Sequence, residues 1–460
     1  MKNKKLGIWG FGAVGTSAVQ FLSRYCKHIT VLDAHSMTAE QFGLLSESNA
    51  KFIHQKNEND LLHFLESHDY IVPSPGIDLR PHAQFAHKWL AEVDIFAHYA
   101  TTPTVAITGT VGKTTVTTQL DALLNAHSTY SIAVGNIGTP LLALIHWIDP
   151  VINEQVDPEI GVVELSSFQL EHNKRYAPDV AILTNLYPNH LDRHGTMEEY
   201  LAAKMKLFLY QKETQHALMP LELLPVLHAQ GYLPALKAHL NFFSLHEPTT
   251  AQISLLPQHC TLFYYHDTQV IKKHGTTIKV IVDLPEALIG TQAINWLICF
   301  AGFNLLDKGD IYHTSPCFKE LEHRMELIGT VHGVHFINDS KATIAQSTLA
   351  AVEQVKGPII LLLGGLSKGV DRTPYIQQLP HNVTHVICFG KEAESLGDMC
   401  KTADRAYTSA ATLEEAFEKA CTIATAGDTV LLSPGGSSYD LFKHYEERGN
   451  CFKKLVQNRL

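Results

Sequence analysis

The chain has 460 residues, of which 45% are hydrophobic and 18% charged, and its formal net charge is −10. A negative chain lacks the basic surface of general nucleic-acid or membrane-surface binders, so we expect no nucleic-acid partner. No stretch approaches the ~20 apolar residues of a membrane span. The eight cysteines include no C-x-x-C pair, which favours neither a zinc site nor a disulfide framework and indicates the reducing cytoplasm. This length predicts about three domains.

The chain opens with a βαβ pattern. Residues 5–9 predict a strand, Gly10–Gly15 spell G-x-G-x-x-G, and a helical run continues to about Tyr25. A second strand over 29–32 ends in Asp33. This pattern is typical of loops that hold NAD, FAD or another nucleotide diphosphate at a helix N-terminus. A tight turn needed only for packing is the alternative.

A further strand is expected over 69–72, and it ends in the loop 73–77, which carries Ser74 and Gly76. Loops at the carboxyl ends of strands bind ligands in open α/β sheets, although the two prolines also suit a plain rigid loop. Residues 97–104 are small and polar and predict a linker.

The strongest local signal is V-A-I-T-G-T-V-G-K-T-T-V at Val105–Val116. A buried strand over 105–107, a glycine turn and a helix opening at Lys113 form a phosphate cradle, because free N–H groups and the helix dipole face the anion. Lys113 is expected to reach the β- and γ-phosphates, and the Thr114 hydroxyl to bind Mg²⁺. The first glycine of the full Walker pattern is missing.

Two later strands carry ionisable residues. Residues 161–170 predict a strand in which Glu164 stands inside an apolar run. A buried carboxylate needs a partner, and a strand beside a phosphate loop is a place for a Mg²⁺ ligand; a salt-bridged core glutamate is the alternative. The strand beginning at Val180 ends in a loop with metal-capable side chains, which suits a second metal or an anion: Asn185, His190, Asp192 and His194.

A helix is expected over 197–206, in which Lys204 on its own indicates an ordinary helix lysine. Short strands are expected within 240–269, and a helix over 285–306 that includes Asn295. Short buried strands alternate with helical runs after the charged stretch 322–326, which predicts a second doubly wound unit. Its loops 364–368 and 433–440 are expected to bind a charged ligand.

Taken in order, these peptides resemble those of the Mur ligases, over nearly the whole chain and most weakly over 210–285. The resemblance is carried by G-x-G-x-x-G, S-P-G-I, T-G-T-x-G-K-T-T, G-N-I-G, E-L-S-S-F-Q-L-E, T-N-x-x-x-x-H-L-D-R-H, A-A-K, H-R-M-E, N-D-S-K-A-T, L-L-G-G and L-L-S-P-x-x-S-S-x-D-x-F. Within the family, E-L-S-S-F-Q-L, D-S-K-A-T and the ending at Arg448-Gly449 favour the branch that adds D-glutamate.

The resemblance implies an α/β fold of three domains. It implies an N-terminal Rossmann-like domain that binds UDP over 1–98, a central P-loop domain with a mixed sheet that binds ATP over 99–320, and a C-terminal Rossmann-like, doubly wound domain that binds the amino acid over 321–460. It also implies the chemistry, in which ATP phosphorylates the carboxylate of UDP-N-acetylmuramoyl-L-alanine and the amine of D-glutamate displaces phosphate. This is a step of peptidoglycan precursor synthesis. Two Mg²⁺ ions, a carbamylated lysine and a cytoplasmic monomer are expected with it.

The same resemblance implies roles for individual residues. Those for the UDP-substrate are Gly12, Ala13, Val14, Asp33, Ser74, Gly76 and Asn136. Those for ATP are Gly109, Thr110, Val111, Gly112, Lys113, Thr114, Thr115, Asn295, Arg324 and Asp339. Those for the amino acid are Lys341, Thr343, Lys368, Ser438, Tyr439 and Tyr445. The implied metal ligands are Thr114, Glu164, His190 and carbamylated Lys204, and the implied catalytic residues are Lys113, His190 and Lys204.

The chain also departs from the family pattern. The family's H-N-x-x-N near adenine is Thr291-Gln-Ala-Ile-Asn295 here, and Gly435, Tyr439 and Tyr445 replace other residue types near the amino-acid pocket. These departures leave L-glutamate as an alternative to D-glutamate. A folylpolyglutamate synthase-like ligase is a further alternative, but in that family the phosphate loop lies close to the N-terminus, whereas here a Rossmann-like unit precedes Lys113. An NAD-dependent oxidoreductase would leave Lys113 unused, and a P-loop regulator would release phosphate without forming an amide. Linkers near 97–104 and 318–324 are the expected hinges for domain closure.

Overall fold

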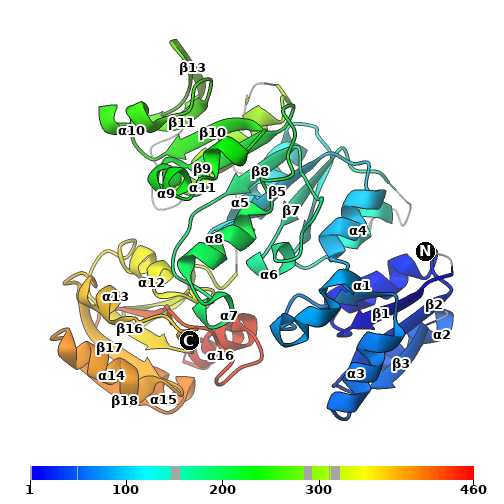
Figure 1. The fold of residues 1–460 in the computed structure, drawn as a ribbon. Coiled ribbons are helices and arrows are strands. Elements are labelled where there is room, and N and C mark those ends of the chain that lie inside the picture. Colours follow the sequence, from blue (N-terminus) through cyan, green and yellow to red (C-terminus); the bar gives the residue numbers. More distant parts are fainter. Residues whose placement is uncertain are drawn as a thin grey trace. The chain divides into compact units, whose positions relative to one another are not determined.

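The computed structural model describes residues 3–48, 50–146, 156–283, 293–309, 311 and 322–459 (Figure 1). Internal contacts divide the chain into two compact units. The first unit comprises Met1–Leu186 and Glu198–Cys317, and the second comprises Tyr187–Met197 and Phe318–Leu460.

The first unit contains a parallel sheet in the order β3-β2-β1-β4, which confirms the predicted βαβ start. Its strands are β1 (Lys5–Trp9), β2 (His28–Asp33), β3 (Ala50–His54) and β4 (Tyr70–Pro73). Its helices are α1 (Ala13–Leu22), α2 (Ala39–Glu47), α3 (Glu58–Ser67), η1 (Arg80–Lys88) and α4 (Glu92–Tyr99). The order 3-2-1-4 is that of a Rossmann half, in which the loop after β1 lies at the carboxyl edge of the sheet.

The same unit contains a larger sheet in the order β13-β12-β11-β10-β9-β8-β5-β7-β6. Its strands are β5 (Thr104–Thr108), β6 (Ser131–Gly135), β7 (Ile160–Glu164), β8 (Val180–Leu183), β9 (His216–Pro220), β10 (His239–Ser244), β11 (Thr261–His266), β12 (Gln269–His274) and β13 (Thr277–Asp283). Pairing is parallel from β6 to β11 and antiparallel for β12 and β13. Because β5 pairs with both β7 and β8, the loops after these strands meet at one edge.

The helices of this larger sheet are α5 (Lys113–Ala126), η2 (Leu141–His146), α6 (Ser167–Leu170), α8 (Met197–Met205), η3 (Leu221–Leu223), α9 (Leu224–Ala229), η4 (Leu233–Ala235), α10 (Thr250–Leu255) and α11 (Ala293–Leu305). The apolar side chains of β5, such as Val105 and Ile107, are fully buried. Buried residues of α1, α4, η2 and the strands form one continuous hydrophobic core.

Two predicted elements were wrong at their ends. The strand expected over 161–170 stops at Glu164, because the Ser166 hydroxyl and the Gln169 side chain form a capping box that starts α6. The linker expected over 97–104 is shorter, since α4 continues to Tyr99 and β5 begins at Thr104. The first part of the helix expected over 285–306 lies outside the described residues, and α11 accounts for the rest.

The second unit contains a sheet in the order β14-β15-β19-β16-β17-β18, parallel except for β14. Its strands are β14 (Glu326–Val331), β15 (Val334–Asn338), β16 (Ile359–Gly364), β17 (Val383–Phe389), β18 (Tyr407–Ala410) and β19 (Thr429–Leu432). Its helices are α7 (Leu191–His194), α12 (Ala345–Val352), α13 (Thr373–Gln377), α14 (Ala393–Thr402), α15 (Leu413–Ile423) and α16 (Tyr445–Gln457). Separate buried clusters cover its two faces, as in a doubly wound sheet.

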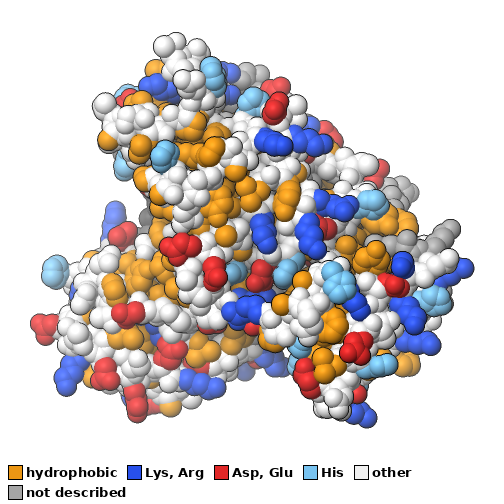
Figure 2. Space-filling view, in the orientation of Figure 1, with side chains coloured by type: hydrophobic (Ala, Val, Ile, Leu, Met, Phe, Trp, Pro, Cys, Tyr) orange, Lys and Arg blue, Asp and Glu red, His pale blue; other side chains and the backbone are white. Residues whose placement is uncertain are grey.

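The α/β class with parallel-rich sheets is confirmed, whereas the predicted domain ranges stay predictions. Each sheet falls inside one of the three predicted ranges, although the compact units do not separate at 98/99. Among the described residues, no helix is long and apolar enough to cross a membrane. On the face shown in Figure 2, Lys and Arg side chains lie among Asp and Glu side chains.

Candidate functional site

The turn between β5 and α5 has a backbone that only glycine accommodates at two positions. Gly109 has φ +147°, and a Cβ there would lie 1.9 Å from the Thr184 hydroxyl oxygen. Gly112 has φ +82°, and a Cβ there would lie 2.8 Å from Asn295 Oδ1. The turn therefore forms although the first glycine of the Walker pattern is missing. The predicted nucleotide residue Asn295 lies directly against this turn.

Asn185, at the end of β8, holds this turn in place. Its Oδ1 accepts from the Val111 N–H at 3.0 Å, and its Nδ2 donates to the Val111 carbonyl at 3.0 Å. The Thr110 N–H also donates to the Asn185 carbonyl at 3.2 Å. Both ends of the Asn185 amide bind the loop backbone, and this scaffolding role was missed by the sequence analysis.

Lys113 and Lys204 converge on one backbone oxygen. Lys113 Nζ donates to the carbonyls of Gly109 and Thr110, each at 2.9 Å, and Lys204 Nζ donates to the same Gly109 carbonyl at 2.8 Å. Two amines this close repel each other when both are protonated. Anions or a change in the charge of one lysine would relieve that repulsion.

Lys204 differs from an ordinary helix lysine. It is 1% exposed, and its Nζ lies 4.5 Å from the centre of the Tyr200 ring. Burial, and secondly the charge of Lys113, hold the pKa of Lys204 well below its usual range. Because the side chain is buried, the interpretation of Lys204 as an ordinary helix lysine is wrong.

Glu164 ends β7 beside β5, where it pairs in register with Ile107. It is 2% exposed, and its Oε1 accepts from Asn136 Nδ2 at 2.9 Å. Its other oxygen, Oε2, is buried and has no hydrogen-bond partner among the described residues. An oxygen of that kind fits a hard cation such as Mg²⁺, whereas the expected alternative, a salt-bridged core glutamate, has no cation beside it in the described ion pairs.

Helix α5 presents Thr114 and Thr115 in its first turn. The Thr115 hydroxyl is buried without a hydrogen-bond partner among the described residues. Together with Glu164, this end of α5 supplies hard oxygen donors beside a helix N-terminus. His190, the remaining predicted metal ligand, belongs to the second unit, where it is the N-cap of α7 with φ +56°.

In the N-terminal sheet, Asp33 supports the glycine-rich loop. Burial acts to raise the pKa of Asp33, but the N–H groups of His35, at 2.7 Å, and Phe11, at 2.5 Å, lower it below its ordinary value. Ser74 Oγ donates to the Gly10 carbonyl at 3.2 Å. The loop residues Gly12 and Ala13 are exposed and Val14 is half-buried, so their backbone faces solvent at the carboxyl edge.

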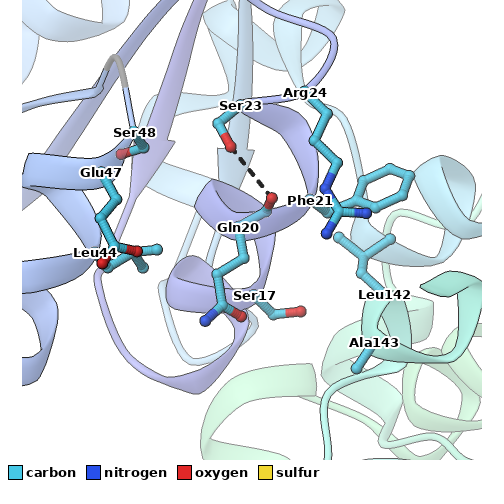
Figure 3. Close-up of a pocket in the computed structure, with 10 residues that line it drawn as sticks. All are labelled: Ser17, Gln20, Phe21, Ser23, Arg24, Leu44, Glu47, Ser48, Leu142 and Ala143. Atoms are coloured by element: carbon cyan, nitrogen blue, oxygen red, sulfur yellow. Dashed lines mark hydrogen bonds between the residues drawn. The ribbon is translucent and has the colours of Figure 1, made fainter. Parts of the chain in front are cut away.

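A cavity of about 520 Å³ lies elsewhere in the first unit, between α1, α2 and η2 (Figure 3). Arg24 lines it from the segment just after α1, Glu47 lines it from α2, and Leu142 lines it from η2. Because α1 runs from the carboxyl edge of the sheet toward the amino edge, Arg24 lies at the far end from Gly12–Val14. None of the predicted site residues lines this cavity.

In the second unit, the loops after β15, β16 and β19 meet at one edge. Asp339 Oδ2 accepts from the Ser433 hydroxyl at 2.7 Å, and Oδ1 accepts from the Met325 N–H at 3.3 Å. Burial raises the pKa of Asp339 to about 7, against the opposing effects of the Ser433 hydroxyl and of the Arg324 and Arg448 charges. The predicted nucleotide residues Arg324 and Asp339 thus interact electrostatically.

The predicted amino-acid residues occupy the same edge. Lys341 Nζ lies 5.1 Å from the centre of the Tyr445 ring. Ser438 is buried, Thr343 is half-buried, and Lys368 is half-buried with φ +54°. Tyr439 is 71% exposed.

Two buried arginines, which sequence reasoning missed, fix these loops. Arg372 donates to the carbonyls of Gly364 and Gly365, at 3.1 and 3.2 Å, and to Glu392 at 2.6 Å. Arg448 donates to the carbonyls of Ser340, at 2.7 Å, and Gly436, at 3.1 Å. The only sequence signal was the family motif ending at Arg448.

The comparisons with known proteins agree with this arrangement. The Mur ligase middle domain matches residues 107–281, and the Mur ligase, glutamate ligase domain, matches residues 323–436. The UDP-N-acetylmuramoylalanine–D-glutamate ligase of Geotalea uraniireducens is 32% identical over 99% of this chain and 98% of its own length. The protein of the same name from Desulfitobacterium hafniense is 33% identical over 99% and 98%.

Solved structures show the same fold at low identity. The MurF ligase from Thermotoga maritima in complex with ADP superposes with a TM-score of 0.55 at 16% identity, covering 100% of this chain and 96% of that one. A pseudomurein peptide ligase type C from Methanothermus fervidus gives 0.55 at 16% identity, covering 99% and 100%. From the full-length relatives and the two matched domains, the chain belongs to the Mur ligase family.

Proposed function

We propose that this ligase uses ATP to join D-glutamate to UDP-N-acetylmuramoyl-L-alanine, as the names of its full-length relatives indicate. The observation that carries the proposal is the convergence of Lys113 and Lys204 on the Gly109 carbonyl, next to a strand that ends in Glu164 with a free oxygen. This is a phosphoryl-transfer site, since it combines backbone N–H groups, a cation and a metal-binding carboxylate. The proposed activity belongs to cytoplasmic peptidoglycan precursor synthesis by a monomer.

The reaction needs activation because the oxide of a carboxylate is a poor leaving group. The substrate carboxylate attacks the γ-phosphorus of ATP, ADP leaves, and an acyl phosphate forms. The D-glutamate amine then attacks the acyl carbon, and phosphate leaves with the C–O electron pair. Lys113 and the N–H groups of the turn oppose the repulsion between the two anions and align them.

The buried Glu164 oxygen without a hydrogen-bond partner and the burial of Lys204 support the proposal of Mg²⁺ and a carbamylated lysine. Thr114, Glu164, His190 and Lys204 would hold two Mg²⁺ ions, which supply charge neutralisation on the phosphates. In the proposed modification, the neutral Lys204 amine attacks the carbon of CO₂ and releases a proton, which turns a cation into a carboxylate ligand. The low pKa of Lys204 supports this step.

The substrate pockets follow the family. Gly12–Val14, Asp33, Ser74 and Gly76 would hold the UDP moiety of the substrate, and Asn136 would meet its muramyl end. Arg324, Asp339 and Asn295 would contact the nucleotide. The edge that carries Lys341, Thr343, Lys368, Ser438, Tyr439 and Tyr445 would take the glutamate, whose two carboxylates suit the lysines. The corresponding domains are proposed as 1–98, 99–320 and 321–460.

The proposal is tested by phosphate release from ATP with purified protein and Mg²⁺. Release is expected only when UDP-N-acetylmuramoyl-L-alanine and D-glutamate are both present, with the amide product identified by mass spectrometry. L-glutamate in place of D-glutamate tests the amino-acid configuration. Phosphate release that does not depend on the muramyl substrate would remove the ligase function and favour a nucleotide-driven regulator.

A further inference from the structure

Glu92, which opens α4, is a buried acid that the proposed reaction does not use. It is 5% exposed, and both carboxylate oxygens are buried without a hydrogen-bond partner among the described residues. Burial raises the pKa of Glu92 to about 7, and three nearby polar groups oppose that rise: the Leu142 N–H, the Gln169 side chain and the Leu141 N–H. A buried acid with this few contacts is costly and calls for a reason.

The three polar groups come from two segments that follow neighbouring strands. Leu141 and Leu142 begin η2, on the segment that leaves β6 through Asn136. Gln169 lies in α6, and its Oε1 accepts from both the N–H and the hydroxyl of Ser166, each at 3.0 Å. Helix α4, which begins at Glu92, packs against both η2 and α6, so Glu92 lies near the segment after Asn136 and the segment after Glu164.

Those two segments carry a pair of residues that must stay aligned. Besides the bond from Asn136 Nδ2 to Glu164 Oε1, the Asn136 N–H donates to the Glu164 carbonyl at 2.8 Å. A Cβ on Gly135 would lie 2.2 Å from that carbonyl, so the two strands already approach as closely as a glycine allows. Because η2 follows Asn136 and α6 follows Glu164 along the chain, a shift of either segment is expected to change the orientation of the Glu164 side chain.

We propose that Glu92 is a positioning residue that holds η2 and α6 on α4 and thereby orients Glu164 Oε2 toward its metal ion. The proposal rests on the metal role of Glu164 in the proposed function. Glu92 acts through Gln169 and the η2 backbone and touches neither substrate nor metal. Partners beyond the first ligands of a metal commonly set its affinity.

Asp94 provides a matched control on the same helix. It is also 5% exposed, and its Oδ1 accepts from the N–H groups of Lys174 and Arg175, both at 3.0 Å. Those residues lie past α6 and do not follow Asn136 directly. Removal of either carboxylate removes a buried polar side chain from α4. Of the two, Glu92 is the one near the segments that align Glu164.

The experiment measures Mn²⁺ binding by electron paramagnetic resonance with ADP present, together with the Tm, for Glu92→Leu, Glu92→Gln, Asp94→Leu and Asp94→Asn. Glu92→Leu is expected to weaken Mn²⁺ binding about 10-fold. Glu92→Gln, which keeps an acceptor of the same shape, is expected to restore most of that loss. Asp94→Leu is expected to lower the Tm without weakening Mn²⁺ binding.

Wild-type Mn²⁺ affinity in Glu92→Leu, or equal weakening in Asp94→Leu, would overturn the positioning role. If Glu92→Leu does not fold, Glu92→Asp serves instead, since its shorter side chain retreats from η2 and α6; unchanged Mn²⁺ binding there would also overturn it. Phosphate release by the wild type is measured separately. A failed ligase assay with intact Mn²⁺ results would therefore count against the proposed function alone.

Discussion

Single residues in this protein are tuned by burial more than by neighbouring charge. Lys204 loses proton affinity and Asp339 gains it because each side chain is removed from water next to few opposite charges. Groups shifted in this way cluster at functional sites, although acids proposed to touch neither substrate nor metal, such as Glu92, shift as well. Variants can separate the two kinds. Removing a functional group lowers the activity even where the removal raises the stability of the fold.

Lys204→Ala is expected to lower ligase activity by about 100-fold, because it removes the proposed carbamate ligand. Added bicarbonate should raise wild-type activity in CO₂-depleted buffer and leave the variant unchanged. Lys206→Ala is the matched control, since Lys206 is half-buried in the same segment and donates to the Glu171 carbonyl. Full activity in Lys204→Ala, or no response of the wild type to bicarbonate, contradicts the carbamate.

Asp339 makes stability depend on pH. Its folded pKa of about 7 lies above its ordinary value of 3.8, so the folded state binds more protons between those values. Stability from this group is therefore present at low pH and is lost as the pH rises toward 7. Asp339→Asn is expected to stabilise the protein at pH 8 by about 2–4 kcal/mol in urea unfolding, while ATP binding weakens.

Asp371→Asn, in the same unit, is expected to change the stability in the opposite direction. The Thr373 N–H lowers the pKa of this exposed carboxylate, so its contribution is present above its ordinary pKa and disappears as the pH falls. Its removal should lower the stability of the protein slightly at pH 8 and have no effect on ATP binding. If the difference in stability between Asp339→Asn and the wild type is the same at pH 5 and at pH 8, the raised pKa of Asp339 is ruled out.

At the scale of elements, the sequence predicted those strands, turns and helices that depend on residues next to one another in the chain. The strand, turn and helix around Lys113 and the strand that carries Glu164 were found, because each depends on hydrophobic runs and glycines next to one another. The end of that strand at Glu164 was not found. The supports were not found, since their partners are remote: Asn185 holds Val111 from 74 residues away, and Arg448 holds Ser340 from 108. Burial of Glu92 and of Lys204 likewise arises only from tertiary packing.

Asn185→Ala tests the support of the phosphate turn. The variant leaves the Val111 N–H and carbonyl without their side-chain partner, so the turn should loosen and the KM for ATP should rise about 10-fold with a smaller change in kcat. Asn125→Ala removes a comparable set of bonds, to Ser131 and Asp121, away from the turn. An equal rise in KM in both variants would mean general destabilisation.

At the scale of the whole molecule, the proposed reaction requires groups from all three proposed domains to meet. We expect ATP, UDP-N-acetylmuramoyl-L-alanine and phosphate-mimicking inhibitors to favour a more compact particle, with the change in the chain near 318–324, of which 318–321 lie outside the described residues. Small-angle scattering should show a smaller radius of gyration with ligands than without. Identical profiles would contradict closure.

The short segment Tyr187–Met197 belongs to the second unit, although the chain on both sides of it belongs to the first. The polypeptide therefore passes from one unit to the other three times, and no single cut yields two contiguous halves. A protease that cuts the chain near residue 318 should leave the two pieces associated under native conditions, because the segment Tyr187–Met197 belongs to the second unit. Genetic dissection of the enzyme into separately expressed lobes would have to carry His190 and its helix α7 along with the carboxyl-terminal lobe.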